Sequence, residues 1–355
     1  MKATTFNLEE KRLKEEISKR GAKRVLIQLP EGLKKEGPRL ATIVEKAGAL
    51  AVVSADPCYG ACDLATLDAK SLDTDLIVHY GHTEMIEQEQ VPTVYIEAKA
   101  KVNVKETVKK AIPLLKRWNN IGLITTVQHA HMLNEAKELL LEAGKTVAIG
   151  DTGRLKHAGQ VTGCDYSNAK FVLKNVEVFL FVGGGRFHAI GATLATAKPT
   201  IVVDPFEKRV YSIEKEAQKI IRQRWASIQD AEKAKSFGVF VGLKTGQKRF
   251  DAALEIKKKL EKDGRSAILL AAREITPETL MEFPNIEAFV NTACPRVSLD
   301  EASKFLKPVL TFNEALVVLG EMDWEELCRK GWFKSERMKT DNNPSDFNVN
   351  DLNKR

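Results

Sequence analysis

The chain of 355 residues is longer than the roughly 250–300 residues that one hydrophobic core can serve, so we expect two or three domains. Its 43% hydrophobic and 29% charged residues are typical of a globular protein, and no apolar run reaches the roughly 18 residues needed to cross a membrane. The net charge of +7 is spread along the chain, and the basic stretches lack the interleaved aromatic residues of a nucleic-acid stacking surface, so we expect no direct nucleic-acid binding.

The N-terminal residues 1–20 are rich in charge and contain no apolar segment. We therefore expect no signal peptide and a cytoplasmic location. In that compartment the five cysteines should be mostly reduced. They are better candidates for packed thiols, metal ligands or catalytic groups than for disulfides.

Short apolar runs rich in valine and isoleucine alternate with amphipathic helical stretches along the chain. Such runs are typical of strands that are buried on both faces of a parallel sheet. They form three sets of four predicted strands. The first set covers residues 24–29, 49–55, 75–80 and 93–98. The second set covers residues 120–126, 145–151, 178–183 and 199–205. The third set covers residues 237–243, 266–272, 287–292 and 308–312.

The three sets repeat at an interval of about a hundred residues, far longer than the period of a solenoid repeat. The pattern predicts an α/β protein of three homologous domains, each a small parallel sheet flanked by helices. We place these domains at residues 1–118, 119–234 and 235–333. Residues 334–355 are polar and without periodicity, which predicts a disordered tail.

Three cysteines lie at the strand ends where open α/β sheets bind their ligands. Cys62 follows the second strand of the first domain, Cys164 lies in the region after the second strand of the second domain, and Cys294 directly follows the third strand of the third domain. If these ends face one another, three thiols meet at a central cluster site. Such a set suits a soft metal or an iron–sulfur cluster, and a 4Fe-4S cluster on three thiolates keeps one iron open.

Simple packing is the competing interpretation for every cysteine, because a free thiol behaves as a small apolar group. We accept it for Cys328, which follows a helical pattern. The coincidence of three thiols at corresponding strand ends favours a ligand role for Cys62, Cys164 and Cys294. The role of Cys58 stays open.

Four motifs are similar to those of a known family: YGACD at 59–63, TGCDYSNA at 162–169, VGGGRFHAIGA at 182–192 and NTACPR at 291–296. They resemble the archaeal diphthamide synthases, the 2-(3-amino-3-carboxypropyl)histidine synthase family, from about Leu29 to Arg296. The resemblance implies three α/β domains with one cluster ligand each, a 4Fe-4S cluster and a homodimer. Within YGACD the shared pattern selects Cys62 rather than Cys58 as the ligand.

The resemblance also implies a reaction. The reduced cluster would cleave the Cγ–S bond of S-adenosylmethionine, and the resulting 3-amino-3-carboxypropyl radical would add to C2 of a histidine imidazole. The target histidine belongs to translation elongation factor 2, and the product is the first intermediate of diphthamide synthesis. An electron donor, not identified by the sequence, is implied as a further partner.

Further polar and glycine residues at the strand ends are candidates for contact with S-adenosylmethionine. The glycines of VGGGR permit close backbone approach to a ligand, and the arginine that follows them could pair with the carboxylate of the amino acid. The predicted set consists of Gly183, Gly184, Gly185, Arg186, His188, Gln247 and His129.

Two other functions remain compatible with the same pattern. Quinolinate synthase also has three α/β domains that each supply one cysteine to a cluster with an open iron, but it is a dehydratase of small acids. Alternatively, the three thiols could hold a structural zinc ion in a binding protein that is not an enzyme.

Overall fold

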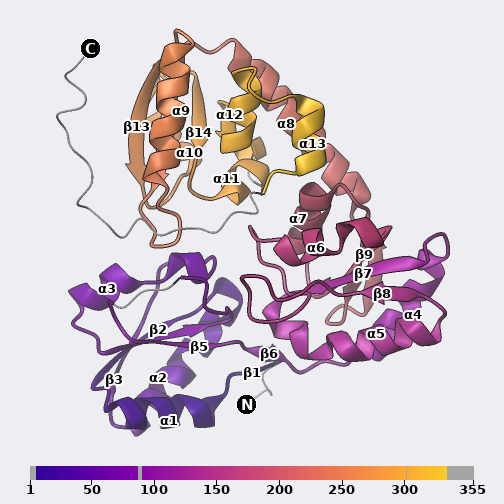
Figure 1. Ribbon diagram of the computed structural model, residues 1–355. Helices are drawn as coiled ribbons and strands as arrows, with labels where there is room; N and C mark the ends of the chain where they lie inside the picture. The colour runs from indigo at the N-terminus through magenta and orange to yellow at the C-terminus, as the bar shows by residue number, and fades with distance from the viewer. Residues whose placement is uncertain (1–4, 87–89, 301, 334–355) are drawn as a thin grey trace.

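The computed structural model describes residues 5–86, 90–300 and 302–333 and shows three lobes (Figure 1). Each lobe contains one sheet with helices packed beside it. Parallel strands form most of every sheet, as expected for apolar runs buried on both faces. The predicted α/β class and the three small parallel sheets are confirmed. The predicted tail at 334–355 lies outside the described residues.

The first lobe, drawn in indigo and purple in Figure 1, has the strand order β3-β2-β4-β5, and all neighbours are parallel. The sequence of its first helix explains which face is buried and where the helix ends. Leu13 and Ile17, one turn apart, are buried against the sheet, and Gly21 ends the helix in the left-handed conformation that glycine adopts without strain. The elements are α1 (Glu10–Arg20), β2 (Arg24–Gln28), α2 (Gly37–Lys46), β3 (Leu50–Val53), α3 (Thr66–Ser71), β4 (Leu76–Tyr80) and β5 (Thr93–Ile96).

The second lobe, drawn in magenta, has the order β11-β10-β9-β7-β8, in which only β11 is antiparallel to its neighbour. The elements are α4 (Lys105–Ala111), β7 (Asn120–Thr125), α5 (Leu133–Glu142), β8 (Thr146–Ala148), α6 (Ser167–Phe171), β9 (Val178–Val182), α7 (Phe187–Thr196), β10 (Thr200–Asp204) and β11 (Arg209–Ser212). The edge strand β11 was not predicted, because its ends are exposed and it is only half-buried.

The third lobe, drawn in orange and yellow, has the parallel order β13-β12-β14-β15. The elements are β12 (Ser236–Gly242), α9 (Phe250–Lys262), β13 (Ser266–Ala272), α10 (Pro277–Met281), β14 (Ala288–Asn291), α11 (Pro295–Asp300), β15 (Val309–Thr311), α12 (Phe312–Val318) and α13 (Trp324–Lys330). Among the described residues, no helix is both long and apolar enough to cross a membrane.

All three sheets use the same order, in which the first strand along the chain lies between the second and the third. Every strand predicted from the sequence is present. The common order supports the predicted homology of the three lobes. It also sends the loops after the first, second and third strands of each lobe to one edge of its sheet.

A small antiparallel pair that the sequence did not reveal joins the first two lobes. Strand β1 (Phe6–Asn7) pairs with β6 (Lys99–Ala100), which follows the last strand of the first sheet. The Phe6 ring packs on the Phe206 ring of the second lobe, with 5.6 Å between the ring centroids. Phe6 is thereby fixed at the junction.

Helix α8 (Glu214–Glu232) joins the second and third lobes. It packs against both α7 and α12, and one apolar core runs from Phe179 in the second sheet through Ile228 of α8 to Val239 in the third. This helix therefore belongs structurally to both lobes. The domain boundaries placed at 119 and 235 stay a prediction.

A buried ion pair fixes α8 to the third lobe. Both carboxylate oxygens of Glu314 accept hydrogen bonds from Arg224, at 2.7 and 2.6 Å, and the remaining guanidinium donors reach the carbonyls of Ser298 and Val309. Trp332 Nε1 also donates to Glu314, at 2.7 Å. Both charged side chains are fully buried, so each depends on the other for compensation.

Breaking this pair from one side should destabilise the protein strongly. Glu314→Gln leaves the Arg224 charge buried without its partner, and we expect a loss of about 3–5 kcal/mol in the free energy of unfolding. Urea denaturation measures it. The matched control is Glu207→Gln, which removes the exposed partner of Arg209 and should change stability by about 0–1 kcal/mol. Equal effects of the two variants would contradict this account of α8.

Candidate functional site

A cavity of about 530 Å³ lies where the strand-end loops of the three lobes meet. Its volume is in the range of small-molecule and cofactor sites, roughly 300–1,000 Å³. The three cysteines singled out from the sequence all line it, one from each lobe. The lining of the cavity includes Tyr59, Cys62, His82, Cys164, Phe187, His188, Lys244, Gln247, Glu274, Cys294, Arg296 and Asp300.

Cys62 lies in a short turn, Ala61–Asp63, that the third lobe holds in place. The Gly246 N–H donates to the Cys62 carbonyl at 2.8 Å, and Gln247 Nε2 donates to Cys62 Sγ at 3.5 Å. The approach is so close that a Cβ at position 246 would lie 2.7 Å from Cys62 Cα. Glycine is therefore required there, and the position of Cys62 depends on contact between the lobes.

A lysine from the third lobe binds the same turn electrostatically. Lys244 Nζ lies 3.1 Å from a carboxylate oxygen of Asp63 and 2.7 Å from one of Glu274. The ammonium also sits 4.3 Å from the centre of the Tyr59 ring. The ion pairs and the ring contact join the loop of the first lobe to the strand end of the third.

Cys164 lies in the long connection between β8 and α6. The Thr162 hydroxyl is 3.9 Å from its sulfur and also accepts the Asp165 N–H. The Asp165 carboxylate forms an ion pair of 2.7 Å with Arg154. Asp165 thus orders the loop that carries the thiol, and its charge is directed to Arg154.

Cys294 lies between the end of β14 and the start of α11. The Asn291 side chain, at the last position of the strand, donates to the Cys294 carbonyl at 2.6 Å and accepts the Ala293 N–H at 2.9 Å. This amide turns the chain sharply after the strand. The thiol consequently faces the cavity.

Arg296 connects the Cys294 loop to the second lobe. Its guanidinium stacks 3.7 Å above the Phe187 ring, donates to the Phe187 carbonyl at 3.0 Å, and lies 2.7 Å from the Asp300 carboxylate. The side chain is buried. A fixed positive charge therefore stands at the edge of the cavity, close to Cys294.

Burial and mutual proximity determine the acidity of the three thiols. Burial raises the pKa of Cys62, and the charges of Cys164 and Cys294 raise it further. Burial raises the pKa of Cys164 to about 11, with a further contribution from Cys294. Burial also raises the pKa of Cys294, although the Arg296 N–H and charge oppose it. Without a cation the thiols are neutral, and only a cationic centre would make the three thiolates stable together.

The cavity contains two of the other predicted site residues, Gln247 and His188. Burial lowers the pKa of His188 to about 3, and the neighbouring Arg296 charge adds to this effect. The imidazole is therefore neutral. Its place beside the cavity is compatible with the contact to S-adenosylmethionine that we predict, which stays a prediction.

The remaining predicted residues do not line the cavity. Gly183, Gly184 and Gly185 lie between β9 and α7, close to Asp204, which accepts the Gly185 N–H at 3.2 Å. Arg186 turns toward α8 and forms an ion pair of 2.8 Å with Glu216.

His129 is also buried away from the cavity. Its ring packs edge-on against Phe206, with 5.4 Å between the centroids. Burial lowers its pKa to about 4. The predicted roles of these five residues in binding S-adenosylmethionine remain untested.

Sequence reasoning did not assign roles to Lys244 and Arg296, although both line the cavity. Arg296 ends the NTACPR motif, directly after the cysteine and proline that mark the strand end, and Lys244 precedes Gln247 in the KTGQ segment. A signal was therefore present in both segments. What the sequence lacked was the lobe arrangement that makes these side chains meet Phe187 and Asp63.

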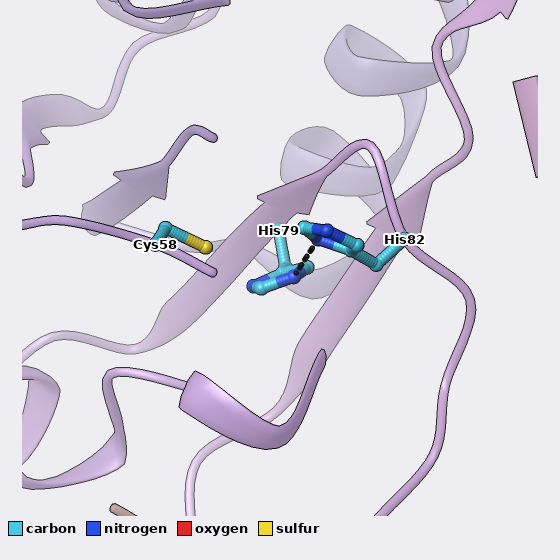
Figure 2. Close-up of side chains that lie close together, drawn as sticks. All are labelled: Cys58, His79 and His82. Carbon is cyan, nitrogen blue, oxygen red and sulfur yellow. Dashed lines mark hydrogen bonds between the residues drawn. The ribbon is translucent and has the colours of Figure 1, made fainter. Parts of the chain in front are cut away.

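The other two cysteines are separate from the cavity. Cys328, in α13, packs at the rim of the core shared by the second and third lobes. Cys58 is buried in the first lobe next to His79 and His82 (Figure 2).

These features define a three-lobed α/β protein whose lobes each bring one cysteine to a common central cavity. The sequence profile described as "Putative diphthamide synthesis protein" matches residues 29–328. The 2-(3-amino-3-carboxypropyl)histidine synthase of Pyrococcus horikoshii is 42% identical over 317 residues, which are 88% of this chain and 91% of the relative. Subunit 1 of the Schizosaccharomyces pombe enzyme of the same name is 31% identical over 343 residues, 92% of this chain and 77% of that subunit.

The solved structures lead to the same group of proteins. The crystal structure of Dph2 from Pyrococcus horikoshii with a 4Fe-4S cluster has a TM-score of 0.84 and 39% sequence identity, and it covers 94% of this chain and 96% of that one. The chain therefore belongs to the diphthamide synthesis family. The resemblance drawn from its motifs is confirmed.

Gly246→Ala tests the close contact at Cys62. A methyl group at this position would press on Cys62 and Ile86, so we expect a loss of about 1–3 kcal/mol in the free energy of unfolding. The control is Gly32→Ala, where an added Cβ meets no described atom within 4 Å. Denaturant unfolding compares the two. A Gly246 variant as stable as the Gly32 variant would show that the lobes do not approach this closely.

The buried His129 should make stability depend on pH. Its folded pKa of about 4 is below the reference value of 6.5, so its contribution is fully present above pH 6.5 and is lost as the pH falls toward 4. The loss should amount to roughly 3 kcal/mol. Unfolding free energies measured at several pH values should fall less steeply for His129→Gln than for the wild type. Identical slopes for the wild type and His129→Gln would refute the assignment.

Proposed function

We propose that the chain is a 2-(3-amino-3-carboxypropyl)histidine synthase. It transfers the 3-amino-3-carboxypropyl group of S-adenosylmethionine to C2 of a histidine in translation elongation factor 2, the first step of diphthamide synthesis. The observation that carries the proposal is that Cys62, Cys164 and Cys294 come from three lobes and line one cavity. Membership in the diphthamide synthesis family supports it.

The donor set of the cavity fits a 4Fe-4S cluster held by Cys62, Cys164 and Cys294. Three soft thiol donors reach the cavity on separate loops, and burial alone disfavours their thiolate forms, which a cluster would stabilise. The solved Dph2 structure with a 4Fe-4S cluster supports the same assignment. When bound, the cluster supplies a reducing electron and one iron without a protein ligand, which can accept the methionyl part of the sulfonium substrate.

The side chains around the thiols provide positioning and charge. Gln247 donates to the Cys62 sulfur and thereby fixes its orientation. His188 is half-buried and burial lowers its pKa to about 3, so it presents a neutral ring to a substrate that carries a positive sulfonium. Lys244 and Arg296 place positive charge at the rim, where the carboxylate of S-adenosylmethionine is a suitable partner.

Positioning decides the outcome of the reaction, because the sulfonium has three S–C bonds that could break. Cleavage at Cγ releases methylthioadenosine, and the 3-amino-3-carboxypropyl radical then adds to the imidazole carbon. The resulting adduct radical loses one electron, which would go back to the oxidised cluster, and one proton, which goes to solvent, as the ring regains aromaticity. Imidazole C2 is a poor nucleophile at neutral pH, which favours the radical route over a polar displacement.

The proposal includes partners beyond the substrate protein. We propose that the chain forms a homodimer and receives its electron from a separate donor protein. We also propose that it works in the cytoplasm, where the elongation factor is found. The net charge of +7 suits docking to an acidic surface of that factor.

The decisive experiment is anaerobic. Reduced, iron-loaded protein incubated with S-adenosylmethionine and elongation factor 2 should yield methylthioadenosine and a 3-amino-3-carboxypropyl adduct on one histidine, detected by chromatography and mass spectrometry. Cys62→Ala, Cys164→Ala and Cys294→Ala should each lower bound iron and abolish the adduct, because each removes one of three ligands.

Cys328→Ala is the matched control, since this cysteine lies away from the cavity, and it should retain both iron and activity. Full iron loading after Cys294→Ala would contradict the proposed ligand set. Quinolinate as the product, or zinc without iron in the anaerobic protein, would instead support one of the two alternative functions.

A further inference from the structure

A second group of potential metal ligands lies in the first lobe. Cys58 is in the loop after β3, His79 is in β4, and His82 is three residues further along (Figure 2). One candidate ligand atom from each lies within 4.8 Å of those from the other two. Cys58 and His79 are buried, and the His82 ring borders the central cavity.

The hydrogen bonds of Gln28 determine which nitrogen of His79 carries the proton. Gln28 Nε2 donates to the Asp63 carbonyl at 2.6 Å, and Gln28 Oε1 accepts the Ala65 N–H at 3.2 Å. If the amide were reversed, its NH₂ group would face the Ala65 N–H and its oxygen would face the Asp63 carbonyl, so the orientation is fixed. The same oxygen lies 2.8 Å from His79 Nδ1. His79 Nδ1 must therefore be the donor.

His79 consequently carries a lone pair rather than a proton on Nε2, and this lone pair accepts the hydrogen bond from His82 Nδ1. Burial lowers the pKa of His79 well below its usual value, so the ring has only the proton on Nδ1. Its Nε2 lone pair points to His82 Nδ1, 2.9 Å away, as the dashed line in Figure 2 shows. A histidine whose other nitrogen donates to a fixed oxygen is the usual arrangement of a metal-binding histidine.

The separations are close to those of a tetrahedral site. With Zn–N near 2.0–2.1 Å and Zn–S near 2.3 Å, two nitrogens on one zinc ion lie roughly 3.3 Å apart, and a nitrogen and a sulfur roughly 3.6 Å apart. The two imidazole nitrogens, 2.9 Å apart, need to move apart by only about 0.4 Å. The Cys58 sulfur lies within 4.8 Å of both, so it needs to approach by at most about 1.2 Å. Rotation of the Cys58 side chain moves its sulfur over that range.

The chemistry of the donors selects the metal. Two imidazoles and one thiol form a borderline-soft set that suits Zn²⁺, whereas Mg²⁺ and Ca²⁺ require oxygen ligands. Burial lowers the pKa of His82 to about 4, so both rings are in the neutral form that binds metal. Simple packing would explain one buried thiol or one buried imidazole, but it does not explain three donors directed at one another.

We propose that Cys58, His79 and His82 bind one Zn²⁺ ion, with water as the fourth ligand, at a site distinct from the three-cysteine cavity. On binding, Cys58 loses its thiol proton to solvent and its sulfur coordinates zinc. The proton of His82 moves from Nδ1 to Nε2, so one proton is released for each zinc ion. No electron is transferred, because Zn²⁺ has no redox chemistry here.

Such a site would brace the loop that carries Cys62. Cys58 and Cys62 are four residues apart in this loop, and the zinc ion would tie it to β4 and to the residue that borders the cavity. The inference stands on the first lobe alone. It holds whether or not the central cavity contains a cluster.

The experiment uses full-length, iron-loaded protein purified anaerobically and dialysed against zinc chloride. Metal analysis should find one zinc ion per chain. Zinc X-ray absorption should show one sulfur neighbour near 2.3 Å and three nitrogen or oxygen neighbours, which are the two imidazoles and the water. Cys58→Ser and His82→Gln should each lose the zinc and keep the iron. Cys328→Ser and the exposed His131→Gln are the matched controls, and they should keep both metals.

A second set of measurements does not rely on metal analysis of the variants. Titration of zinc into the protein in buffers of different ionisation enthalpy should give one proton released per ion, and chelation should lower the melting temperature of the wild type but not that of Cys58→Ser. Zinc with three sulfur neighbours would place the ion in the central cavity and overturn the proposal. Unchanged zinc in Cys58→Ser, loss of iron in that variant, or no zinc retained by the wild type would overturn it equally.

Discussion

The contact between the third lobe and the Cys62 turn is the constraint on which the site depends. Parallel sheets bring their loops to one edge, but three separate edges form a common cavity only if the lobes dock closely. At Gly246 the backbone of the third lobe approaches Cys62 without room for a side-chain carbon, and Gln247 and Lys244 bind the same turn on either side. Arg296 plays the corresponding part toward the second lobe, through Phe187.

This docking gives the cavity its chemical character. The thiols are half-buried, and the charge of Cys294 raises the pKa of both Cys62 and Cys164. The nearby His188 imidazole is neutral, and the cations are paired at the rim. A centre of this kind disfavours isolated thiolates and favours a cationic cofactor that takes all three together. The proposed transferase and its sulfonium substrate are compatible with these charges.

Much of the fold could be predicted from the sequence, because strands buried on both faces leave continuous apolar runs. The repetition of four such runs indicated three related sheets, and the strand-end rule pointed to Cys62, Cys164 and Cys294. Contacts between side chains that are distant in the sequence could not be predicted in this way. Arg186 follows a glycine run that suggests ligand contact, yet a helix 30 residues further along supplies Glu216 as its partner. His79 reads as one polar residue in a strand, and only the fold brings it to Cys58 and Gln28.

The three lobes are not joined equally. One continuous core extends from the second sheet through α8 into the third, and Cys164 packs at its margin, whereas the core of the first lobe is made of its own residues. Polar contacts face the second lobe instead, such as the hydrogen bond from Gln160 to Thr83 and the ion pair of Glu97 with Lys156. The spacing of Cys164 and Cys294 is therefore set by a single interior, whereas Cys62 belongs to a lobe with a core of its own. In this respect the site resembles an interface between subunits.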